Sequence, residues 1–158
     1  MRTRRKKSTI GLALLVGIVA LVPLTQATAG GIVTLDTSLT GAAEVPGPGD
    51  ANGTGGATID LDPVADEVCF EVTWRGIDRP LAAHIHRGSA SIAGRVRVEL
   101  FASSEPLPST IKGVQGCVRG VDSDLIDRMI ANPERFYVNV HTRAYPDGAI
   151  RGQLAVAI

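Results

Sequence analysis

Three histidines are the residues of this chain best suited to chemistry. His84 and His86 stand two positions apart in a run that alternates apolar and polar residues, and the third histidine, His141, closes a second run of the same kind. In a β-strand, side chains two positions apart point to the same face, with Cα atoms roughly 6.5–7 Å apart. If the two polar faces meet, the whole histidine content of the chain lies in one place.

Three histidine rings brought together in this way could bind a metal ion. Neutral imidazole is a good ligand for zinc and copper, so His84, His86 and His141 could form a three-histidine site with a position open to water or substrate. Ring nitrogens that cannot come within roughly 4 Å of each other would exclude it. The alternative is that the rings are polar surface residues, hydrogen-bonded to neighbours such as Tyr137, Asn139 or Glu99. The sequence leaves both interpretations open.

The elements that would position these residues are short runs of period-two alternation, separated by turn residues. Strands are expected at residues 32–39, 57–61, 67–74, 81–86, 95–101, 114–121, 135–142 and 149–156. One amphipathic stretch, capped by Asp122 or Ser123 and ended by Asn132-Pro133, predicts a short helix. The Pro- and Gly-rich segment 44–56 is expected to be a surface loop. This pattern predicts an all-β fold, an antiparallel Greek-key sandwich or flattened barrel of about eight strands.

The same alternation predicts which side chains face the core. Val96 is expected to point inward with Val98 and Leu100, away from Arg95 and Arg97. On the last strands Asn139, Arg151 and Gln153 fall on the polar side, where they could form a patch that binds an anion or a partner. A solvated sheet face is the simpler interpretation, because antiparallel sheets often leave one face to water.

The two cysteines, Cys69 and Cys117, are expected to form a disulfide. Both fall on strand faces opposite the apolar ones, and their 48-residue separation would give, in the chain-entropy model, about 4 kcal/mol of stabilisation at most. Two free thiols are the alternative, which suits an exported chain less well.

The N-terminus predicts export. A basic cluster at residues 2–7, an uncharged apolar run at 10–22 and the small residues Ala27 and Ala29 resemble a secretory signal, so the mature domain is expected to span residues 30–158. An uncleaved N-terminal anchor is the alternative, but the apolar run is shorter than the roughly 20 residues needed to span a bilayer. Five of the 16 Lys and Arg lie in that signal, which leaves 11 against 16 Asp and Glu. An acidic domain with no basic run argues against a nucleic-acid partner, and no second apolar segment suggests membrane insertion. We therefore expect a secreted, periplasmic or cell-envelope protein.

Four ordered blocks resemble the CHRD domain, the module named after the developmental protein chordin and found singly in many secreted bacterial proteins. The blocks are Leu39–Pro46, Ala83–Gly88, Phe136–Thr142 and Pro146–Leu154. The resemblance covers nearly all of the expected mature chain. It implies a β-sandwich that is similar in outline to the copper/zinc superoxide dismutase barrel.

For function, the resemblance implies a non-enzymatic binding or structural module outside the cytoplasm, with a protein or small ligand as its partner. The alternative is a copper- or zinc-binding protein that uses His84, His86 and His141 for storage, delivery or tolerance, with no cofactor otherwise required. A metal-dependent redox enzyme is the remote third hypothesis. Superoxide dismutase activity is not expected, because the bridged dinuclear site of that family needs more histidines than this chain has.

Overall fold

The computed structural model describes residues 30–157, so the expected signal sequence lies outside the described residues. The described part forms nine β-strands, one α-helix and two 3-10 turns. Their bounds are β1 Val33–Thr40, η1 Gly41–Ala43, β2 Thr54–Asp62, β3 Glu67–Arg75, β4 Pro80–Arg87, β5 Arg95–Ala102, β6 Gly113–Arg119, α1 Ser123–Ala131, η2 Pro133–Arg135, β7 Phe136–Thr142, β8 Ile150–Gln153 and β9 Ala155–Val156.

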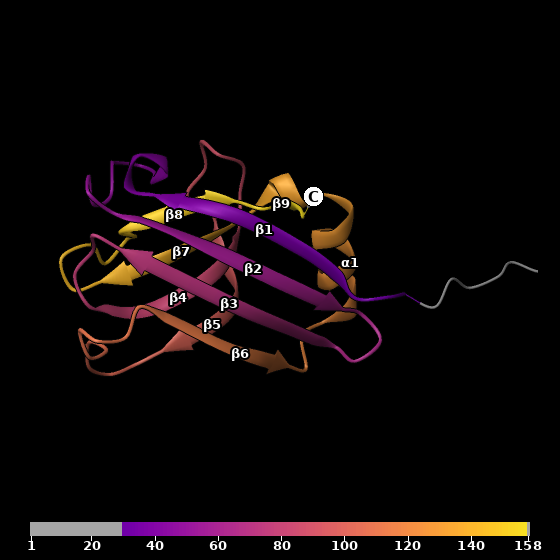
Figure 1. Ribbon diagram of the computed structural model, residues 1–158. Helices are drawn as coiled ribbons and strands as arrows, with labels where there is room; N and C mark the ends of the chain where they lie inside the picture. The colour runs from indigo at the N-terminus through magenta and orange to yellow at the C-terminus, as the bar shows by residue number, and fades with distance from the viewer. Residues whose placement is uncertain (1–29, 158) are drawn as a thin grey trace, which may run out of the picture.

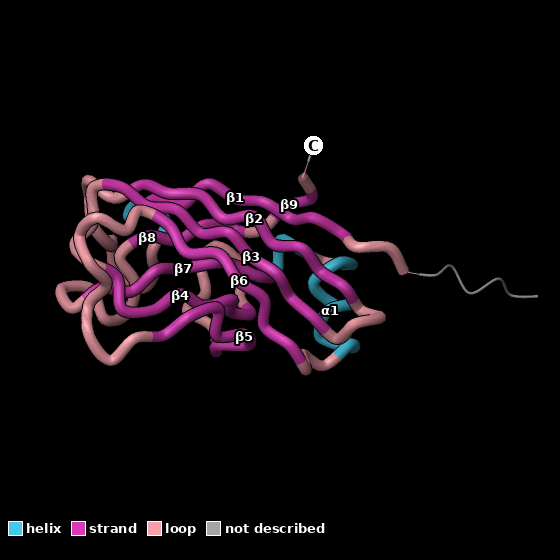
Figure 2. The backbone as a smooth tube through the Cα atoms, turned by 60° about the horizontal axis from the view of Figure 1, so that its bottom comes forward, coloured by secondary structure: helices cyan, strands magenta, loops and turns pink. Residues whose placement is uncertain are grey.

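The strands form one antiparallel sheet that curls into a nearly closed barrel (Figure 1). Eight of them follow the order β5-β4-β7-β8-β1-β2-β3-β6, and the short β9 pairs with β1. The two edge strands, β5 and β6, come into contact, as the turned view in Figure 2 also indicates. The pairs β4–β7 and β3–β6 join strands that are not consecutive in the chain. The prediction of an all-β antiparallel fold with one short helix is confirmed.

The core lies inside the curled sheet and is built from the apolar side of each alternating run. Ala83 and Ile85 of β4 and Phe136, Val138 and Val140 of β7 are all buried in it. Each fully buried Ile, Phe or Val side chain stabilises the fold by about 1.5–3 kcal/mol. The strands that carry the histidines are therefore held in place by their inner faces.

Helix α1 lies at one end of the barrel (Figure 1) and covers the core there. Its apolar stripe is buried through Leu125, Ile126 and Met129. The side chain of Asp122 accepts a hydrogen bond from the backbone N–H of Leu125 at 3.1 Å, so Asp122 is the N-cap.

Two expectations about the strands were wrong. Residues 54–56 belong to β2 rather than to the preceding loop. Gly55 serves close packing there, since a Cβ on it would collide with the backbone oxygen of Thr73 across the β2–β3 ladder. Val96 is 47% exposed instead of inward-facing, because β5 is an edge strand whose pairing with β4 shifts register near His86.

The disulfide prediction is confirmed. Cys69 of β3 and Cys117 of β6 are directly opposite each other in the ladder and are bonded, with an S–S distance of 2.06 Å. The bond joins the edge strand β6 to the body of the sheet.

Candidate metal centre

Three adjacent strands, β4, β7 and β8, place the candidate residues in cross-strand rows. His84 pairs with Asn139, which pairs with Arg151, and His86 pairs with Tyr137, which pairs with Gln153. Paired residues of an antiparallel sheet share a face. His141 lies opposite Ala82, one row beyond His84. The register therefore gathers all three histidines on the outer face of the barrel.

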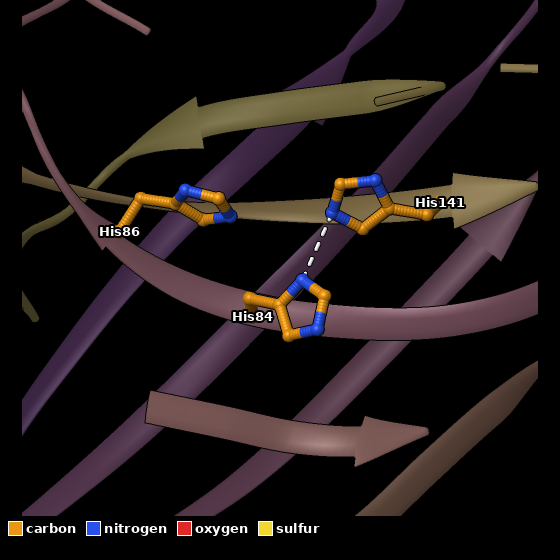
Figure 3. Close-up of side chains that lie close together, drawn as sticks. All are labelled: His84, His86 and His141. Carbon is orange, nitrogen blue, oxygen red and sulfur yellow. Dashed lines mark hydrogen bonds between the residues drawn. The ribbon is translucent and has the colours of Figure 1, made fainter. Parts of the chain in front are cut away.

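The three imidazole rings point toward one another (Figure 3). The Nδ1 atom of His84 lies 3.0 Å from the Nε2 atom of His141, and the Nε2 atom of His86 faces the same pair. One ring nitrogen from each histidine lies within 4.8 Å of the other two. Two of the three are thus closer than the roughly 4 Å expected of a metal site, and His86 stands slightly further out.

Backbone carbonyls fix the orientation of two of these rings. The Nδ1 atom of His86 lies 2.9 Å from the carbonyl oxygen of Gly94, and the Nδ1 atom of His141 lies 2.9 Å from that of Pro146. A carbonyl oxygen can only accept, so each Nδ1 carries the proton and each Nε2 presents a lone pair. The Nε2 atom of His86 is buried with no hydrogen-bond partner among residues 30–157. This is how proteins orient histidines that bind metals.

Asn139 lies beside the rings and contacts His141. Its amide nitrogen donates to the carbonyl oxygen of Asp147 at 3.4 Å, and its Oδ1 lies 2.9 Å from the Nε2 atom of His141. A neutral imidazole has a single N–H, yet His141 faces two acceptors, Asn139 Oδ1 and the Pro146 carbonyl oxygen. With the amide of Asn139 in this orientation, one of these contacts joins two acceptors. A doubly protonated ring, a nearby metal ion, or an amide turned so that its Nδ2 donates to the Nε2 atom of His141 would each remove the conflict.

The electrostatics of the cluster disfavour the doubly protonated ring. Burial lowers the pKa of His84 from 6.5 to about 4, with the neighbouring histidines adding to the effect. Burial also lowers the pKa values of His86 and His141. All three rings are therefore neutral at pH 7, which is the form that binds metal ions.

The distances fit one small cation after a minor adjustment. Zinc–nitrogen bonds of about 2.0–2.1 Å place the nitrogens of a tetrahedral site about 3.4 Å apart. The present limit of 4.8 Å requires His86 to approach the other two rings by little more than 1 Å, roughly what side-chain rotation supplies. His84 is reachable from solvent, since 16% of its side chain is exposed. The arrangement can accept a metal and leaves room for a further ligand.

The polar patch is buried, which corrects the expectation of a solvated sheet face. Asn139 and Arg151 are each only 1% exposed. The loop between β4 and β5 covers Arg151, whose Nη2 donates to the carbonyl oxygens of Ser89 at 2.8 Å and Ile92 at 3.1 Å. Alternation identified the polar face, but it could not show that a loop would fold over it.

Arg151 and His86 are linked by an aromatic ring. The guanidinium carbon of Arg151 lies 3.4 Å from the ring centroid of Tyr137, and the ring of Tyr137 stacks on that of His86 with centroids 4.8 Å apart. Gln153 adds hydrogen bonds to the carbonyl oxygens of Gly88 at 2.6 Å and Glu134 at 2.7 Å. These residues position the histidines and the loop above them. The polar patch therefore supports the site and is not an exposed binding surface.

Two contributors were missed by the sequence reasoning. Gly94 and Pro146 act through backbone carbonyls, which carry no signal in residue type. Glu99 was considered only as a neighbour of the histidines, and its carboxylate lies 3.9 Å from the Nε2 atom of His84. That distance is too long for a hydrogen bond, so Glu99 does not fix the tautomer of His84, whose Nδ1 atom faces His141.

A second group of potential ligands, Glu67, Cys69 and Cys117, is present on β3 and β6. The disulfide removes both thiolates, so this group offers no such site in the oxidised protein.

Comparison with known proteins identifies the family. The CHRD domain model matches residues 35–154, and the chain therefore belongs to the CHRD domain family. No curated protein and no solved structure matches it. Among residues 30–157 no helix is both long and apolar enough to cross a membrane.

Proposed function

We propose that this CHRD domain binds one copper or zinc ion through His84, His86 and His141, in metal storage, delivery or tolerance outside the cytoplasm. Membership of the CHRD family supports a binding or structural module, and the disulfide is consistent with secretion. The proposal adds the ligand. It assigns a binding role and no catalytic step.

The observation that carries the proposal is the orientation of the three rings. Two Nδ1–H groups are tied to the carbonyl oxygens of Gly94 and Pro146, and the opposite nitrogens converge with that of His84. Hydrogen-bonded polar surface residues would explain single contacts. They would not explain the buried Nε2 atom of His86, which has no hydrogen-bond partner among residues 30–157. A metal ion satisfies all of these atoms together.

The choice of metals follows from the ligands. Three neutral imidazoles suit copper(II) and zinc, whereas calcium and magnesium require oxygen ligands. No thiolate is available to select copper(I), because both cysteines are in the disulfide. Asn139 Oδ1 or a water molecule could complete the coordination.

The experiment is isothermal titration calorimetry. Zinc or copper(II) is titrated into metal-stripped protein that carries no added tag at its N-terminus. We expect one ion per chain, and at least 100-fold weaker binding in His84→Ala and His141→Ala. Glu71→Gln, an exposed change on β3, is the control and should bind as the wild type does. Unchanged affinity in both histidine variants would refute the site.

A further inference from the structure

A separate cavity of about 340 Å³ opens between the segment that follows β1 and the loop between β7 and β8. The histidines do not line it. Its walls include Glu44, Pro46, Pro48, Tyr145, Pro146 and Asp147. One acidic group, three proline rings and one phenol ring therefore surround the space, with a second acidic side chain, that of Asp147, exposed to solvent.

Glu44 is the unusual member of this wall. It is 8% exposed, and its Oε1 atom has no hydrogen-bond partner within the described part of the chain. Its carboxyl group packs against the backbone of Gly148, where a Cβ atom would collide with it, and Gly148 has a φ of +144° that disfavours other residues. The loop is thus shaped around this carboxyl group.

Glu44 has no cation bound to it in the described residues. Among residues 30–157 no ion pair within 4.0 Å involves Glu44. The guanidinium of nearby Arg151 contacts Tyr137 and donates from Nη2 to two loop carbonyls, while its Nη1 has no hydrogen-bond partner in that range. Burying an ionised carboxylate without a partner is costly. Consistent with this, burial raises the pKa of Glu44 to about 7, although Arg151 acts in the opposite direction. A cationic ligand would supply the missing partner.

The surroundings define the kind of cation. Calcium takes six to eight oxygen ligands, and Glu44 belongs to neither of the groups of three potential metal ligands found in residues 30–157. Proline rings and a tyrosine ring instead suit a hydrocarbon stem that ends in a charge. An organic cation fits both the acid and the walls.

We propose that this cavity binds a primary alkylammonium group, with the Glu44 carboxylate as its counterion and the proline and tyrosine rings against its hydrocarbon stem. The group could belong to a small free amine or to the lysine side chain of a partner protein. Both present the same chemistry to the cavity. The proposal is independent of metal binding.

The test is an NMR titration of the full chain, followed through its backbone amides. The probes are n-butylammonium, spermidine and Nα-acetyl-lysine N-methylamide, with 1-butanol as the uncharged counterpart of the first. We expect saturable shifts at the amides of Gly148 and Gly49, which both adjoin the Glu44 side chain, and no comparable shift with 1-butanol. Tightest binding of the lysine derivative identifies a protein partner as the source, and tightest binding of either other amine identifies a free amine.

Substitutions then assign the counterion. Glu44→Gln should weaken n-butylammonium binding about tenfold or more, because it removes a charge-assisted hydrogen bond. Asp147→Asn, at an exposed position, should weaken it several-fold without disturbing the fold, and Glu71→Gln should leave it unchanged. Equal shifts with 1-butanol, equal binding by wild type and both cavity variants, or shifts confined to residues elsewhere would each overturn the proposal.

Discussion

The Nδ1 atom of His84 lies 3.0 Å from the Nε2 atom of His141, although 57 positions separate the two residues in the chain. The contact exists because β4 and β7 are neighbours in the sheet while β5, β6 and α1 lie between them in sequence. Only folding brings these nitrogens together. Metal binding should therefore depend on the folded state and stabilise it.

Thermal unfolding checks this linkage. At a zinc concentration 100 times the dissociation constant, we expect a gain of about 2.7 kcal/mol and a rise in Tm of about 10 °C. His84→Gln, which keeps a polar side chain of similar size, should lose most of that rise, and Glu71→Gln should keep it. An equal rise in His84→Gln and wild type would place the bound zinc elsewhere.

Stability should depend on pH through the three histidines, whose pKa values are lowered, and through Glu44, whose pKa is raised. His84 has a pKa of about 4 in the folded protein against 6.5, so the unfolded chain binds more protons in that window and stability falls as pH decreases from 6.5 to 4. Glu44 has a pKa of about 7 against 4.5, so the folded protein binds more protons there and stability falls as pH rises from 4.5 to 7.

Glu44→Gln separates the two contributions. The variant lacks the buried charge, so its stability relative to wild type should increase by up to about 3 kcal/mol between pH 4.5 and pH 8. Urea unfolding at several pH values, with metal absent and the disulfide intact, measures the difference. A difference that stays constant across this range would mean that Glu44 is not charged in a buried site at pH 8.

The fold was predictable because the strands show local alternation of apolar and polar residues in the sequence. Val68, Phe70 and Val72 alternate with polar residues in β3, and such alternation survives any tertiary arrangement. The convergence of the histidines was predictable only as a hypothesis, since alternation places His84 and His141 on polar faces without saying that β4 and β7 are neighbours. The topology supplies that information.

The rest of the site was beyond reach of the sequence for physical reasons. In the sequence, Arg151 has the pattern of a surface residue. Its guanidinium can be buried only because the folded 88–94 loop presents backbone carbonyl oxygens that accept its hydrogen bonds. Glu44 likewise reads as the start of a Pro- and Gly-rich loop. Its burial depends on the β7–β8 loop, about 100 residues later in the chain, which closes against it.

Arg151→Lys should destabilise the protein by about 2 kcal/mol, since a lysine cannot reproduce the planar contact with Tyr137 together with both carbonyl bonds. It should also weaken zinc binding, because the loop that Arg151 holds ends at Gly94, whose carbonyl oxygen orients His86. Arg143→Lys, in an exposed pair with Glu105, is the matched control and should cost little. Urea unfolding measures the stability and zinc titration measures the affinity. Loss of stability with unchanged zinc affinity would show that the loop does not support the metal site.

Replacing both cysteines, Cys69→Ala with Cys117→Ala, should lower the free energy of unfolding by at most about 4 kcal/mol in the chain-entropy model, since the bond closes a 48-residue separation. The effect arises mainly in the unfolded chain, because the β3–β6 ladder holds β6 in place without the bond. Zinc affinity of the folded double variant should be unchanged, as the histidines lie on β4 and β7, away from this ladder. Urea unfolding and zinc titration measure both quantities, and a double variant that folds but no longer binds zinc would show that the β3–β6 edge supports the metal centre.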